Sequence, residues 1–234
     1  MTDQLNTNKF KPTFENGGFW EYYKDLENQF QNFLEYVPYL NGNENTYSFK
    51  LLSQILSIGG YIDSAFNEMA RFSKFSENEI CLRILRRAAQ RLGIIKSGIE
   101  AFDNLYNISN RTVTFKFIPE RVDIQPFNCT DTIPEWWDFY NELKHDVGIN
   151  LEKANLKNTR DALAAAFLLN VIHEPGILRL YNYDVLKFYT IVRGEPSKHL
   201  SKSIPRKDFE RLIHERQSFW GSVQTDLFVY DFNQ

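Results

Sequence analysis

The amino-acid sequence predicts an all-α protein, a helical bundle with a small β-hairpin inserted near residues 111–127. Apolar side chains recur at helical spacing through most of the chain. The alternation of apolar and polar residues that is typical of a strand is clear in one short stretch, after residue 111. At 234 residues, the chain is long enough to bury a core without disulfides or metals.

The composition excludes several classes of protein. Charged residues make up 24% and aromatic residues 15%, which argues against disorder, a collagen-like chain, a coiled coil or a disulfide scaffold. The 27 basic and 30 acidic side chains give a net charge of −3, which argues against non-specific nucleic-acid binding by the whole surface. Because no apolar run approaches the roughly 20 residues that span a bilayer, and no export signal is recognised, we expect a cytoplasmic protein without membrane contact.

The first half of the chain predicts three helices. Residues 1–13 form a polar, flexible lead, and residues 14–234 are expected to form a single domain. Apolar residues at helical spacing predict helices over 14–37, 47–72 and 77–106. The pair Gly59-Gly60 lies inside the second of these. Since each glycine costs about 1 kcal/mol in a helix relative to alanine, the pair predicts close helix packing or a kink.

The second half predicts further helices around one central helix. In chain order, the expected elements after the hairpin are a helix from Pro134, helices over 152–173 and 177–192, a basic loop over 193–204, a helix from Pro205 and an edge strand over 227–232. From Ala162 to Ile172, apolar residues point in every direction. A helix that is apolar all round belongs at the centre of a bundle.

Four arginines of the third predicted helix form a candidate anion-binding or RNA-binding stripe. They are Arg83, Arg86, Arg87 and Arg91. Like charges at helical spacing repel one another, and no acidic residue lies between Ile80 and Ile99 to neutralise them. Arginine rows of this kind bind phosphates or carboxylates. The alternative is an ordinary solvated helix face.

Local motifs for the common enzymatic chemistries are absent. The sequence has no phosphate-binding GxxxxGK[ST], no GxGxxG, no GxSxG, no HExxH and no CxxC. Its four histidines are scattered, and Glu142, which precedes His145 by three, has no second Glu-x-x-His pair. We therefore predict neither a metal site nor a cofactor, and we regard a metal-dependent hydrolase as a weak alternative.

The most unusual stretch is the helix that follows Pro134. Asn141 and His145 are four residues apart and share one face, and Lys144 follows Tyr140 by the same interval. Imidazole acts as a general acid or base near neutral pH, and an ammonium group binds phosphate. Alternatively, Lys144 and His145 only complement the dipole at the end of a helix.

These residues resemble the signature of the HEPN superfamily, helical-bundle proteins that include metal-independent ribonucleases, toxins and non-catalytic RNA binders. Asn141 and His145 match the family motif, whereas Tyr140 stands where the family has arginine. A group of uncharacterised bacterial proteins with a YN-x-x-KHD core is also similar. The resemblance implies an RNA-handling protein of a bacterial defence or toxin system, and a homodimer.

In the ribonuclease that this resemblance implies, His145 is the proton donor or acceptor. Asn141 and Tyr140 orient the imidazole and the scissile phosphate, and Lys144 stabilises the negative charge of the transition state. In the alternative, the chain is a non-catalytic protein-interaction module or a homo-oligomeric structural protein. A surplus of acidic residues over 1–46 and of basic residues over 177–216 fits an anionic partner or docking between subunits.

Overall fold

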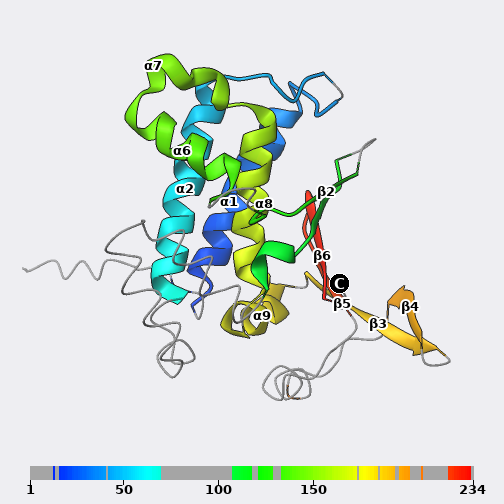
Figure 1. Cartoon of the computed structure of the whole chain (residues 1–234). Helices are drawn as coiled ribbons and strands as arrows, with labels where there is room; N and C mark the ends of the chain where they lie inside the picture. The colour runs from blue at the N-terminus through cyan, green and yellow to red at the C-terminus, as the bar shows by residue number, and fades with distance from the viewer. Residues whose placement is uncertain are drawn as a thin grey trace, which may run out of the picture.

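Helices and an antiparallel sheet together form the protein, as a computed structural model shows (Figure 1). The structure describes residues 13, 16–40, 42–69, 107–117, 121–128, 133–172, 174–183, 185–192, 195–200, 207 and 221–232. The predicted lead over 1–13, apart from residue 13, lies outside these residues. So do the predicted helix over 77–106 and nearly all of the helix predicted from Pro205.

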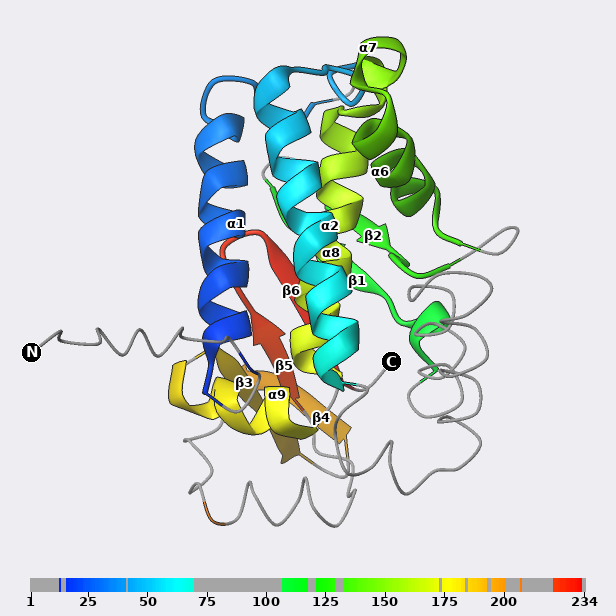
Figure 2. The same ribbon diagram turned by 90° about the vertical axis from the view of Figure 1, so that its left-hand side faces the viewer.

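In the part of the chain that the structure describes, four long helices lie side by side. They are α1 (Gly18–Leu34), α2 (Phe49–Met69), α6 (Glu135–His145) and α8 (Leu156–Val171) (Figure 2). All side chains of α8 from Ala162 to Val171 are buried, which confirms the predicted central helix. Asn155 begins α8, because its side-chain Oδ1 accepts a hydrogen bond from the Asn158 backbone N–H at 2.9 Å.

Shorter helical elements lie between the long helices and after the last of them. They are η1 (Ile108–Asn110), α7 (Val147–Asn150), η2 (Leu151–Lys153), α9 (Glu174–Leu180) and η3 (Tyr181–Tyr183). The turn α7 lies at the end of the bundle where α1 also ends and α2 begins, and α9 lies at the other end (Figures 1 and 2).

The sheet covers one side of α8. Its strands are β1 (Val113–Phe115), β2 (Val122–Ile124), β3 (Leu186–Val192), β4 (Glu195–Leu200), β5 (Gly221–Gln224) and β6 (Phe228–Asp231). Their order is β2-β1-β6-β5-β3-β4, with every neighbouring pair antiparallel. Phe228 of β6 stacks on Phe167 of α8 with ring centroids 5.7 Å apart, so the sheet and the central helix share one core.

The predicted all-α class is therefore right for the bundle and wrong for the sheet: the fold is largely helical but mixed. The hairpin near 111–127 is confirmed as β1 and β2. The helix predicted over 177–192 ends at Leu180, and residues 186–192 form β3, because LKFYTIV is rich in the β-branched and aromatic residues that favour strands. The predicted basic loop contains β4, and the predicted edge strand, β6, lies inside the sheet.

A buried carboxylate fastens α1 to the sheet. Glu27 is fully buried, and its Oε1 accepts hydrogen bonds from Tyr23 Oη at 3.0 Å, from the Leu227 backbone N–H at 3.2 Å and from Thr225 Oγ1. Its Oε2 forms an ion pair with the Lys24 ammonium. Because both oxygens are satisfied, the charge is tolerated in the core. The contact ties the middle of α1 to the turn between β5 and β6.

Candidate functional site

The helix α6 carries the predicted site at its C-terminal end. Its inner face is buried through Trp136, Trp137, Tyr140 and Leu143. Trp136 Nε1 donates a hydrogen bond to the Pro126 carbonyl at 2.7 Å, which fixes the start of the helix against the segment that follows β2. The inner face of α6 therefore packs in the core, while its outer face is accessible to solvent.

Tyr140 lies where α6 packs closely against α2. A Cβ atom added to Gly59 would lie 2.3 Å from Cε2 of the Tyr140 ring, so only glycine fits at that position. Gly60, the next residue, has no neighbouring atom within 4 Å of such a Cβ. The close helix packing predicted from the Gly59-Gly60 pair is confirmed, and it rests on Gly59 alone.

The position that holds arginine in the HEPN motif is thus part of the helix interface. Tyr140 is 4% exposed, and its ring contacts Trp137 with centroids 4.7 Å apart. Burial raises the pKa of the Tyr140 hydroxyl, and the negative charge of Asp63 raises it further. The phenol therefore stays protonated at neutral pH. It can donate a hydrogen bond, but it supplies no positive charge for a phosphate.

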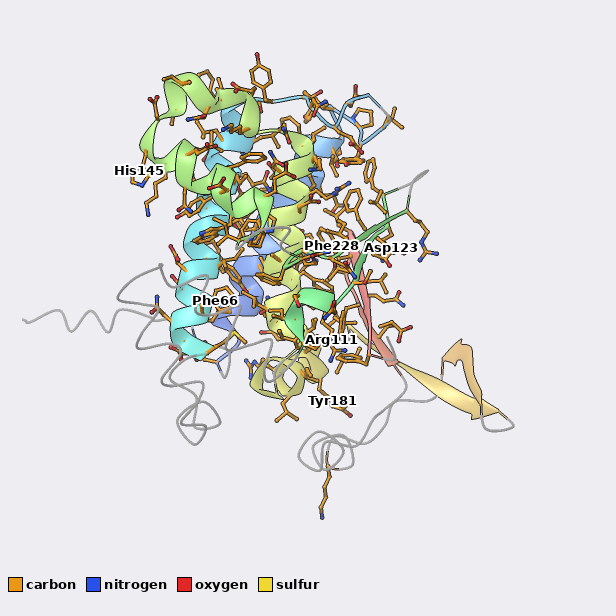
Figure 3. The ribbon with its side chains drawn as sticks, in the orientation of Figure 1. Phe66, Arg111, Asp123, His145, Tyr181 and Phe228 are labelled. Atoms are coloured by element: carbon orange, nitrogen blue, oxygen red, sulfur yellow. The ribbon has the colours of Figure 1, made fainter. Side chains whose placement is uncertain are left out.

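Three other predicted residues are accessible at this end of α6. Lys144 and His145 are exposed, and Asn141 is half-buried. Figure 3 shows His145 on the outer side of α6, directed away from the bundle. The His145 side chain makes no hydrogen bond or ion pair with another described residue. It is therefore not a buried histidine bonded to a backbone carbonyl, although its place in the last turn complements the helix dipole.

Asp63 of α2 is a site residue that the sequence reasoning missed. Its half-buried carboxylate faces α6, where it interacts electrostatically with Lys144 and Tyr140. Burial raises the pKa of Asp63, and the nearby Lys144 charge partly opposes this rise. The signal was present in the sequence, because Asp63 lies four residues after Gly59 and so shares its face of α2.

Two acidic residues of α6 already have partners from the elements that follow it. Lys153 of η2 forms an ion pair with Glu142, and its ammonium also lies 5.2 Å from the centroid of the Phe139 ring. Lys157 of α8 lies 2.8 Å from Glu135. These pairs neutralise part of the negative charge of α6, which favours the approach of an anion to its outer face.

The remaining predicted site residues are not placed. The predicted stripe of Arg83, Arg86, Arg87 and Arg91 lies outside the described residues. Among the residues that it does describe, no group of three His, Cys, Asp or Glu side chains is arranged to hold a metal ion. Within the same ranges, no helix combines the length and apolar character needed to cross a bilayer.

The chemistry available at the end of α6 is an imidazole, an ammonium and an amide on the accessible side of the helix. A carboxylate from α2, that of Asp63, interacts electrostatically with the ammonium. This set suits proton transfer and the binding of an anion. Comparison with protein-family models, with curated proteins and with solved structures found no match to the chain. Its function is therefore inferred from this geometry.

Proposed function

We propose that this chain is a HEPN-like protein that acts on RNA through the outer face of α6. The observation that carries the proposal is the accessible His145 beside the accessible Lys144, since both side chains can reach a ligand from solvent. A helical bundle holds the two residues in place, because the inner face of α6 packs against α2 and α8. The class of substrate comes from the resemblance of this helix to the HEPN motif.

The reaction that fits these residues needs no metal. The 2′-oxygen of a ribose attacks the adjacent phosphorus, and its proton passes to water. As the bond from phosphorus to the 5′-oxygen breaks, His145 donates a proton to that oxygen. Lys144 stabilises the negative charge that collects on the phosphate oxygens, and Asn141 orients the imidazole or the phosphate. The products are a 2′,3′-cyclic phosphate and a 5′-hydroxyl end.

Tyr140 determines which residue of α6 would bind the phosphate. In the HEPN motif, arginine is thought to contact the phosphate, whereas Tyr140 is buried against Gly59. Phosphate binding therefore depends on Lys144, which is the nearest exposed cation on the same helix. Where that contact is too weak for catalysis, the same face serves as a non-catalytic RNA-binding surface.

The test measures cleavage and binding separately. Single-stranded RNA is incubated with the full chain in EDTA, and the ends of the products are identified. We expect cyclic phosphate ends and a rate that falls about 100-fold or more in His145→Ala, the usual contribution of a general acid or base. For binding, we expect Lys144→Ala to weaken affinity and to lower the salt dependence by about one released counterion.

A matched control separates a site from a general change in charge. Lys50 is an exposed lysine at the start of α2, away from the site residues, so Lys50→Ala removes the same charge elsewhere. RNA cleavage that is absent, or equal in wild type and His145→Ala, removes the enzymatic form of the proposal. RNA binding that is absent, or lost equally in Lys144→Ala and Lys50→Ala, removes the RNA-binding form.

A second candidate function is that of a protein-interaction module, which requires no catalytic role for His145. Of the six large apolar side chains that are exposed among the described residues, five lie just after α1, at the start of α2 or in α7. Figure 2 shows these segments at one end of the bundle. The five side chains are Tyr36 (85% exposed), Leu40 (39%), Tyr47 (53%), Phe49 (71%) and Ile149 (74%). Exposed apolar side chains that gather on one part of a surface mark interaction sites more often than chance.

This apolar end is held in a defined shape. The backbone N–H of Leu156 donates to the Thr46 carbonyl at 3.0 Å, and Tyr47 pairs with Asn155 in an isolated antiparallel bridge. Size-exclusion chromatography with light scattering tests the candidate. If the end mediates self-association, the variant carrying Tyr36→Ser, Phe49→Ser and Ile149→Ser should be a monomer where wild type is not. A wild-type monomer would leave only a different protein as partner.

A further inference from the structure

Two helices bring one acidic, one basic and one aromatic residue together beside the proposed RNA site. On α2, Asp63 follows Gly59 by four residues, and on α6, Lys144 follows Tyr140 by four, so each pair lies on one face of its helix. The Tyr140 ring covers Gly59, and the Lys144 ammonium lies 5.7 Å from the centroid of that ring. We name Asp63, Tyr140 and Lys144 the interhelical patch.

Lys144 interacts with both other members of the interhelical patch. The aromatic ring of Tyr140 attracts the ammonium, as rings do for cations within about 6 Å. The carboxylate of Asp63 also attracts the ammonium, although the two groups form no direct ion pair. Because Asp63 is half-buried, its charge is less screened than that of a fully exposed acid. An RNA phosphate that reaches Lys144 thus meets an ammonium whose charge is already partly offset.

We propose that Asp63 restrains Lys144 and weakens the binding of RNA phosphates to α6. This inference rests on the proposed RNA-binding function. The carboxylate acts in two ways, because it competes with the phosphate for the ammonium and also repels the phosphate directly. Both effects disappear when Asp63 carries no charge, while the shape of the patch is preserved by asparagine.

The test compares two substitutions that remove the same charge. Affinity for a fluorescent 12-nucleotide single-stranded RNA is measured in EDTA, at one salt concentration. We expect Asp63→Asn to bind about three- to tenfold more tightly than wild type, as removal of a nearby charge in partly screened surroundings should produce. Asp25 is an exposed acid of α1, outside both the patch and α6. We expect Asp25→Asn to change affinity less than twofold.

A double variant shows whether Asp63 acts through Lys144. In the Lys144→Ala background, Asp63→Asn should increase the affinity for RNA by much less than threefold. The inference is overturned if Asp63→Asn and Asp25→Asn bind alike, or if the full gain persists without Lys144. RNA binding that is lost in Lys144→Ala but unchanged in Asp63→Asn overturns only this inference. No measurable binding by any variant overturns the proposed function, and this inference with it.

Discussion

Replacing Gly59 by alanine should force α2 and α6 apart and destabilise the protein. The added Cβ would lie 2.3 Å from Cε2 and 2.4 Å from Cδ2 of Tyr140. Favourable carbon–carbon contacts need about 3.5–4.0 Å, so the ring or the helix must move by at least about 1 Å. The ring itself is confined, because it is buried and packs against Trp137 at a centroid distance of 4.7 Å.

The size of the effect follows from two opposing terms. Alanine gains about 1 kcal/mol over glycine in the interior of a helix. Overpacking of a closely packed core costs about 1–3 kcal/mol. Since the overlap here is with several ring atoms at once, we expect the upper part of that range and a net loss of about 1–2 kcal/mol. Gly60→Ala meets no atom within 4 Å and should therefore stabilise the protein by up to about 1 kcal/mol.

Urea unfolding of the two alanine variants measures this difference directly. Because both substitutions gain the same helix propensity, the difference between their free energies of unfolding reports the clash at Tyr140, and we expect about 2–3 kcal/mol. Tyr140→Leu in the Gly59→Ala background should recover part of the loss, since it removes the ring that clashes. Equal stability of Gly59→Ala and Gly60→Ala would refute the close contact between α2 and α6.

Two further predictions concern buried or half-buried acids. Glu27→Gln should lower the free energy of unfolding by about 2–3 kcal/mol, because an amide group would face the Lys24 ammonium. Thr225→Val removes one hydrogen-bond donor to Glu27 and should lower the free energy of unfolding by about 1–2 kcal/mol. Urea unfolding measures both changes. In the folded protein, the pKa of Asp63 is raised above its ordinary value of 3.8. Wild type should therefore lose stability relative to Asp63→Asn as the pH rises from about 3 to about 7. A stability difference that does not change with pH would contradict the raised pKa.

The helices were predictable from sequence because each one has a local signal. The periodic apolar residues of α1 and α2, and the fully apolar stretch of α8, report burial without knowledge of any partner. The strands β3 and β5 depend instead on distant pairing: Leu186 pairs with Val223, far along the chain. Apolar residues in a short segment fit a helix or a strand, and only the partner strand decides between them.

The site was predictable only in part, for a similar reason. The spacing of Asn141 and His145 marks one face of a helix, but it does not show which neighbouring residues that face meets. Asp63 enters the patch because the small Gly59 lets Tyr140 approach α2, which is a contact between helices. The burial of Glu27 could have been predicted, because it occupies a core position in the apolar pattern of α1, and a buried acid needs hydrogen-bond donors around it.

The departure from the HEPN motif can be tested by restoring arginine at position 140. The side chain there is 4% exposed and faces Gly59, so Tyr140→Arg would place a guanidinium in the interface between α2 and α6. Asp63 would offset the charge only partly, and the contact with Trp137 would be lost. We therefore expect a loss of about 3 kcal/mol or more in the free energy of unfolding, and no gain in RNA affinity over Tyr140→Leu. Tighter RNA binding by a stably folded Tyr140→Arg variant would mean that this position reaches the ligand, and phosphate binding would then not depend on Lys144.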